Sequence, residues 1–166
     1  MVSTAAATAV QGWLNARRLR QPEISTTSET VPELVLANRR TKRSDPAFAQ
    51  AHYVENPDRI ECVVAEGEDG TVLGFQSLKI AREGNAYGTP VGWGIIGTHI
   101  RPSAARRGVG TQLFATTREA ARKAGLKAID AYIGAENAEG QAYYEAMGFR
   151  THRHADGAVA KVYEVR

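Results

Sequence analysis

A helix-like segment that follows an arginine- and glycine-containing turn constrains the fold of this chain more than any other feature. Between Val109 and Ala124, apolar or small residues recur at the spacing of one helix face, and Gly125 follows where such a helix would end. Upstream, residues 91–100 are rich in β-branched and aromatic side chains and are followed by Pro102. The middle of the chain therefore reads as a strand, a turn and a long helix.

Further β-rich runs surround this unit. Residues 60–65 and 72–80 flank an Asp-Gly turn at 68–71 and predict an antiparallel hairpin. Glycines at three positions in the strand predicted over 91–100 indicate a bulge or the close approach of another backbone: Gly92, Gly94 and Gly97. The remaining ranges predict a strand at 128–133, a helix at 138–147 before Gly148, and a terminal hairpin of 149–154 and 159–165. Together these elements predict an α+β fold.

The N-terminal third carries weaker signals. Residues 21–24 predict a short strand, and residues 30–52 predict helical structure. A second helix is predicted to start at Ser44-Asp45-Pro46, and a turn is predicted at 56–58. Residues 1–20 read as an extension or short helix before a domain over 21–166. Because no acidic residue precedes Glu23, an organellar transit peptide is an alternative reading of this segment.

Length and composition exclude several classes of protein. A chain of 166 residues is the size of one domain, and no apolar run approaches the roughly 20 residues that cross a bilayer, so we expect no membrane partner. The single cysteine, Cys62, excludes an internal disulfide and a cysteine-based zinc site, so we expect no metal and a reducing, cytoplasmic setting. A net charge of +3 argues against a nucleic-acid partner, and the short basic cluster at 39–43 reads as a solvated helix face.

The turn before the long helix is a candidate anion site. Its residues would place unpaired backbone amides in the first turn of the helix, and two arginines add positive charge. They are Arg106, Arg107, Gly108, Val109, Gly110 and Thr111. The pattern is neither a Walker loop nor a full dinucleotide fingerprint, and glycines that serve backbone conformation alone are an alternative.

A second motif lies in the later helix and its flanks, over Asn137 to Phe149. Together with Ile100-Arg101-Pro102 and the Arg-Arg-Gly-Val-Gly turn, it resembles the GNAT superfamily of acetyl-CoA-dependent N-acetyltransferases. The similarity is specific from about Val91 to Phe149. This chain departs from the family pattern at Ala105, where the family usually has Gln or Arg, and at Gly140, where it usually has Ala.

The resemblance implies an α/β/α architecture with a mixed, mostly antiparallel central sheet flanked by helices. It implies that the strands ending near Ile100 and Ile133 splay apart and that the pantetheine of acetyl-CoA enters between them. Residues 106–111 would then bind the pyrophosphate, Asn137 would bond the pantetheine arm, and Tyr144 would act as general acid near the sulfur. A helix cap for Asn137 and a core position for Tyr143 or Tyr144 are the alternatives.

The implied reaction is direct attack of a neutral primary amine on the acetyl thioester. A strand amide near His99 or Ile100 would polarise the carbonyl, and no covalent enzyme intermediate is required. The position where the family usually carries an acidic base has none here, so His99 is the candidate base, with a water relay as the alternative. Cys62 is expected to be a buried hydrophobe. His152 and His154, which would share one strand face, read as surface residues.

The sequence does not identify the acceptor; we expect a small-molecule or peptide amine, with its determinants in residues 30–60, in the loop 83–90 and in the terminal hairpin. A non-catalytic acyl-CoA-binding or regulatory domain is the alternative function. The assembly is left open, with a homodimer among the alternatives.

Overall fold

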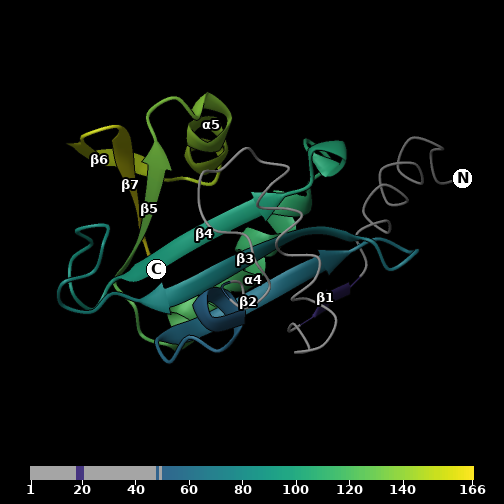
Figure 1. Cartoon of the computed structure of the whole chain (residues 1–166), viewed down its shortest axis with the longest axis horizontal. Helices are drawn as coiled ribbons and strands as arrows, with labels where there is room; N and C mark the ends of the chain where they lie inside the picture. The colour runs from purple at the N-terminus through teal and green to yellow at the C-terminus, as the bar shows by residue number, and fades with distance from the viewer. Residues whose placement is uncertain (1–17, 21–47, 49) are drawn as a thin grey trace, which may run out of the picture.

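The computed structural model describes residues 18–20, 48 and 50–166 (Figure 1). The predicted strand at 21–24 and most of the helical region 30–52 lie outside these residues. The described elements follow in this order: β1 (Arg18–Arg20), the π-helical turn η1 (Gln50–Val54), β2 (Arg59–Glu66), β3 (Val72–Ile80), β4 (Gly94–Ile100), the 3-10 turn η2 (Pro102–Ala104), α4 (Val109–Lys123), β5 (Ala128–Gly134), α5 (Ala138–Ala146), β6 (Arg150–Ala155) and β7 (Ala158–Glu164).

One mixed sheet holds the seven described strands, in the order β1-β2-β3-β4-β5-β7-β6. All neighbouring pairs are antiparallel except β4 and β5, which run parallel because α4 connects them as a crossover. The mixed, mostly antiparallel sheet with flanking helices is confirmed. The strand β1 extends this sheet into residues 18–20, which the sequence assigned to the extension before the domain.

Side chains that alternate along β2 build cores on the two faces of the sheet. Cys62 and Val64 pack with Tyr53 from η1 on one face, whereas Val63 and Ala65 pack with Leu113 from α4 on the other. A third core joins α4 and α5 through Phe114, Tyr144 and Phe149. Figure 1 shows η1 in front of the sheet and α4 behind it.

Predicted and observed bounds agree closely for β3, α4 and β5. The strand β4 is shorter than predicted, because residues 91–93 form a turn in which Gly92 has a φ of 85°. Of the two alternatives predicted for the glycines of this strand, the bulge is wrong, since β3 and β4 pair without a register shift. Gly94 instead makes room for side chains: a Cβ there would lie 2.8 Å from Leu78 Cδ1 and 2.9 Å from Leu126 Cδ1.

No helix among the residues that the structure describes is long and apolar enough to cross a membrane.

Candidate functional site: the opening between β4 and β5

The two parallel strands separate soon after they meet. Their pairing covers only Gly94 with Ile129 and Ile95 with Asp130. From residue 96 to residue 100, the edge of β4 that faces β5 pairs with no described strand, and Figure 1 shows the two strands diverging. Backbone N–H and C=O groups along this edge are therefore available to an extended ligand.

The turn at 106–111 leads into α4 with its amides outside the helical ladder. Gly108 is the N-cap residue with a φ of 80°, and the first helical bond joins Gln112 N to Gly108 O at 3.1 Å. The amides of Val109, Gly110 and Thr111 precede that bond. The first turn carries no acidic side chain, and Arg106 and Arg107 are exposed beside it. This helix start can accept an anion.

Gly110 also makes room for a side chain of α5, which the sequence did not predict. A Cβ at this position would lie 2.6 Å from Cε2 of Tyr143 in α5, and the Tyr143 hydroxyl donates to Gly110 O at 2.8 Å. The glycine therefore lets α5 pack against the start of α4. Substitution of Gly110 would disturb this packing as well as any bound phosphate.

Tyr144 belongs to a hydrogen-bond network at the opening. Its ring is 5% exposed, and its hydroxyl lies 2.8 Å from Oγ1 of Thr98, which is in the unpaired stretch of β4. Gln76 Nε2 donates to Thr98 Oγ1 at 2.8 Å and to the Tyr143 hydroxyl at 3.1 Å. Both tyrosine rings are thus held by packing while both hydroxyls reach toward β3 and β4.

The two tyrosines differ in their surroundings. Tyr143 is half-buried. Its burial raises the pKa of its hydroxyl well above the ordinary value, and the neighbouring Tyr144 makes a smaller contribution in the same direction. The Tyr143 hydroxyl therefore stays protonated and remains a donor to the Gly110 carbonyl. Its role in the structure is to fix the start of α4, whereas the Tyr144 hydroxyl faces β4.

His99 lies on the opposite face of β4 from Thr98, as alternation along a strand requires. Its ring is 3% exposed and stacks on Phe75, with ring centroids 4.6 Å apart, while its Nε2 lies 3.5 Å from the Tyr53 hydroxyl. The side chain also lines a pocket on the η1 face of the sheet. The structure thus brings His99 to the same strand segment as the Tyr144 hydroxyl, but from the other side.

Asn137 caps α5. Its Oδ1 accepts a hydrogen bond from Gly140 N at 2.9 Å, so the capping alternative describes a real contact. A Cβ at Gly140 would lie 2.6 Å from Nδ2 of Asn137. The departure from the family pattern at Gly140 therefore gives the asparagine amide room, and Nδ2 is the atom left for a ligand.

Cys62 has no reactive character. The side chain is 1% exposed, and burial raises the pKa of its thiol to about 12. The thiol is therefore protonated at neutral pH and is a poor nucleophile.

Among the described residues, no group of three or more His, Cys, Asp and Glu side chains is arranged to hold a metal ion.

The pocket on the η1 face lies over β3 and β4. Aromatic and polar side chains line it from η1, from strands β2 to β5 and from the connecting loops. The loop residue Tyr87 forms one wall, with its ring 5.6 Å from that of Tyr132 in β5. This pocket reaches the strand opening through His99 and Gly97.

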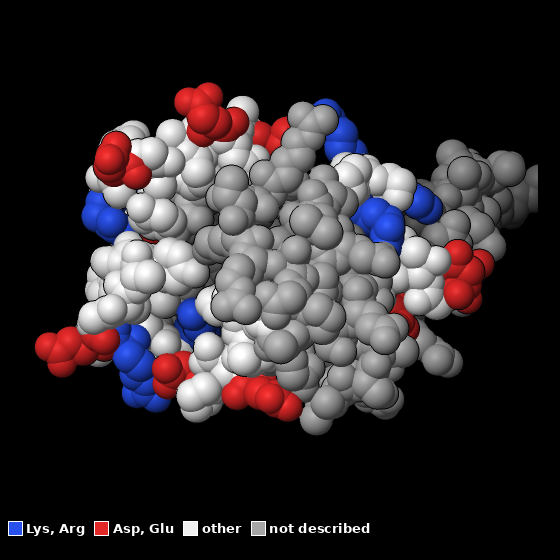
Figure 2. Space-filling model, viewed as in Figure 1, with Lys and Arg blue, Asp and Glu red and all other residues white. Residues whose placement is uncertain are grey.

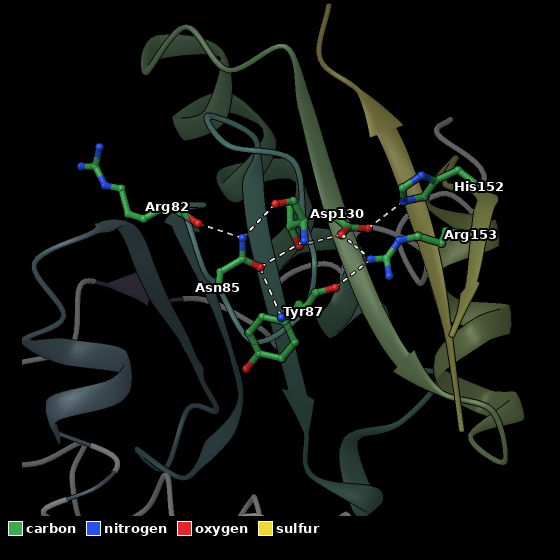
Figure 3. A network of polar contacts seen from close by, with 7 residues as sticks. Arg82, Asn85, Tyr87, Asp130, His152 and Arg153 are labelled. Carbon is green, nitrogen blue, oxygen red and sulfur yellow. Dashed lines mark hydrogen bonds and ion pairs between the residues drawn. The ribbon is translucent and has the colours of Figure 1, made fainter. Parts of the chain in front are cut away.

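A buried carboxylate holds the loop that supplies Tyr87 (Figure 3). Asp130 is fully buried and accepts from Thr89 Oγ1 at 2.7 Å, while His152 Nε2 lies 3.0 Å from its other oxygen. Arg153 donates to the backbone carbonyl of Tyr87 at 2.7 Å. A register shift in β6 lets two successive residues, His152 and Arg153, turn toward Asp130. His152 is therefore half-buried and paired, not a surface residue as the sequence predicted; His154 is exposed.

The sequence matches the family described as Acetyltransferase (GNAT) family over residues 26–149. The chain belongs to the GNAT acetyltransferase family. No curated protein sequence matches it.

Solved structures of GNAT proteins share the fold at low sequence identity. PaiA N-acetyltransferase from Thermoplasma acidophilum, in complex with coenzyme A, is 15% identical, with 89% of this chain and 98% of that chain covered and a TM-score of 0.67. yncA from Salmonella typhimurium, with its cofactor acetyl-CoA, is 20% identical, with 92% and 95% covered and a TM-score of 0.64. A GCN5-related N-acetyltransferase from Kribbella flavida is 19% identical, with 89% and 96% covered and a TM-score of 0.70.

Within this GNAT fold, sequence reasoning missed three polar groups around the opening. Gln76 is fully buried in β3, Thr98 is buried in β4, and Asp130 is fully buried in β5. Each is a polar side chain buried within a strand, and a buried polar side chain signals a hydrogen-bond partner. Their partners are distant in sequence, so the signal shows that a network exists without showing its members.

Proposed function

We propose that the protein transfers the acetyl group of acetyl-CoA to a primary amine of a small molecule or peptide, by direct attack. One observation carries this proposal. The Tyr144 hydroxyl lies at Thr98, in the stretch of β4 that has lost its pairing with β5. Family membership supports the acetyl donor, and the solved GNAT structures that hold acetyl-CoA or coenzyme A support the same donor here.

The residues at the opening fit an elongated, anionic donor. The amides at 109–111 and the charges of Arg106 and Arg107 would hold the pyrophosphate. The unpaired edge of β4 would bond the pantetheine amides, and Asn137 would contribute Nδ2, since its Oδ1 caps α5. The backbone amide of His99 or Ile100 would polarise the thioester carbonyl.

In the transfer, the amine nitrogen forms a bond to the carbonyl carbon and the bond from that carbon to sulfur breaks. Tyr144 donates its hydroxyl proton to the departing thiolate, and the proton that the acylated nitrogen releases returns through water to restore the phenol. The Thr98 hydroxyl, 2.8 Å away, can then donate to the phenolate oxygen and stabilise it. The buried, protonated Cys62 takes no part, so no acyl-enzyme forms.

An ammonium ion must lose a proton before it attacks. His99 is the proposed base because it lines the pocket on the face of β4 opposite the Tyr144 hydroxyl. A chain of waters that ends on backbone carbonyls is the alternative acceptor of this proton.

We propose a cytoplasmic setting from the single buried cysteine, and either a monomer or a homodimer as the assembly.

A panel of primary amines with acetyl-CoA, monitored by released CoA thiol and by mass spectrometry of the products, tests the proposal. Stoichiometric N-acetyl product and CoA support it. Binding of acetyl-CoA by calorimetry, with no product from any amine, would instead identify a non-catalytic acyl-CoA-binding domain.

A further inference from the structure

The pocket on the η1 face is cationic at one end. Lys79 and Arg59 both line it, and they are direct partners across the antiparallel pair of β3 and β2. Like charges at such directly opposed positions repel one another. A pair of cations at this place therefore favours an anion that lies between them.

No described carboxylate neutralises these two cations. Neither side chain forms an ion pair with an acidic residue in the part of the chain that the structure describes, and none of the described residues that line the pocket is Asp or Glu. The nearby Asp58 instead bonds Arg82 at 2.7 Å. Figure 2 shows both acidic and basic side chains on the described part of this face.

The lysine is held in place. Its ammonium nitrogen lies 5.7 Å from the ring centroid of Tyr87, and the loop that carries Tyr87 is fixed through Thr89 to Asp130 and through Arg153. A cation that rests on an aromatic ring keeps its charge while its position is restricted. The geometry therefore presents a directed positive charge to the pocket.

The other end of the pocket is the strand opening. His99 lines the pocket there, four residues beyond Ile95, the β4 partner of Lys79. Four residues along a strand separate Cα atoms by roughly 13 Å, and the long side chains of Lys79 and Arg59 shorten the distance that a ligand must span. The pocket thus has a cationic end and a reaction end, separated by the length of a small molecule.

We infer that the acceptor is a primary amine that also carries an anionic group, a carboxylate, phosphonate or phosphate, bound by Lys79 and Arg59. This inference rests on the proposed N-acetyl transfer. An amine that lacks an anion arrives as a cation and is repelled by the pair. An amino carboxylate is neutral overall, an amine with a phosphonate or phosphate is neutral or anionic, and each is attracted at its anionic end. The amino group then faces His99 while the anion faces Lys79.

Matched acceptors test this inference. Amino acids are compared with their carboxamides, and aminoalkyl phosphonates with the alkylamines that lack the phosphonate, by kcat/KM for CoA release. We expect the anionic member of a pair to be at least tenfold better. Carboxamides or alkylamines that react as well as their anionic partners would overturn the inference while leaving N-acetyl transfer intact.

Charge variants connect the preference to the residues. Lys79→Gln and Arg59→Gln should each lower kcat/KM for the anionic acceptor about tenfold and change it little for the neutral one. Lys127→Gln, which removes an exposed lysine outside the pocket, is the matched control and should change neither. Equal losses for both members of a pair would overturn the inference. Arg59 is exposed, so its variant is informative even if Lys79→Gln does not fold.

If no amine is acetylated, the proposed function is wrong. Whether Lys79 and Arg59 form an anion site is then tested by measuring ligand binding. Calorimetry with an amino acid or aminoalkyl phosphonate, in the presence of CoA, should show binding to the wild-type protein that Arg59→Gln or Lys79→Gln weakens about tenfold. Absent binding, or binding that both variants leave unchanged, would overturn the inference.

Discussion

The hydroxyl oxygen of Tyr144 lies 2.8 Å from Oγ1 of Thr98, and this contact joins α5 to the part of β4 that pairs with no described strand on the β5 side. The next residue, His99, faces the other side of the sheet and lines the pocket there. The proposed general acid and the proposed base therefore approach one strand segment from opposite faces. This arrangement separates the group that protonates the thiolate from the group that deprotonates the amine.

Removal of the Tyr144 hydroxyl should affect turnover. Tyr144→Phe keeps the buried ring but removes the proton, so we expect kcat to fall by roughly ten- to ten-thousand-fold with little change in the Kd for acetyl-CoA. Tyr143→Phe is the matched variant. Because the Tyr143 hydroxyl bonds Gly110 O at the start of α4, it should weaken acetyl-CoA binding and spare kcat. Steady-state kinetics and calorimetry separate the two effects, and the reverse ordering would assign the acid to Tyr143.

Replacement of His99 should change the pH profile. In His99→Gln, the rate should fall mainly at low pH, where the acceptor is protonated and assistance matters most, and high pH should partly restore it. His154→Gln, at an exposed position outside the pocket, is the control and should follow the wild type. A folded His99→Gln variant with an undiminished profile would leave the water relay as the proton acceptor.

Gly110 should prove important for packing before any ligand binds. A Cβ would lie 2.6 Å from the Tyr143 ring, so Gly110→Ala should lower the free energy of unfolding by about 1–3 kcal/mol, the usual cost of overpacking. The same substitution in a Tyr143→Ala background should cost much less, because the ring is gone. Chemical denaturation of the four proteins gives this coupling, and additive losses would show that the ring is not the cause.

The buried thiol should make stability depend on alkaline pH. The pKa of Cys62 is about 12 in the folded protein and 9.0 as its ordinary value. A raised folded pKa gives stability that is complete below pH 9 and is lost as pH rises toward 12, since the unfolded chain ionises first. The stability difference between wild type and Cys62→Ala should therefore shrink from pH 8 to pH 10.5. A constant difference over this range would mean that the thiol ionises equally in both states.

Local patterns predicted most of the described elements. The Asp-Gly turn between two β-rich runs gives β2 and β3, and the helical spacing after the Arg-Arg-Gly-Val-Gly turn gives α4. The strand β4 was predicted too long because Trp93 and Val91 favour strands, whereas Gly92 at positive φ forms a turn. At residues 91–93, the left-handed backbone conformation that glycine allows outweighs the strand propensity of the neighbouring side chains.

The arrangement of the site was less predictable, because its contacts join distant parts of the chain. The Gln76 amide meets Thr98 and Tyr143, and Asp130 meets Thr89 and His152, across separations that no local pattern encodes. The sequence identified candidate residues through family resemblance. The strand faces on which these residues lie, and the pairing of Lys79 with Arg59 at the pocket on the η1 face, follow only from strand register.

The most direct test of the central claim is isotope transfer from acetyl-CoA labelled in its acetyl group to an amine acceptor, measured for wild type and Tyr144→Phe at saturating acetyl-CoA. We expect labelled N-acetyl product in a one-to-one ratio with free CoA from the wild type, and a product rate at least tenfold lower from a folded Tyr144→Phe that still binds acetyl-CoA. Equal product rates from the two proteins, or bound acetyl-CoA without labelled product, would contradict it.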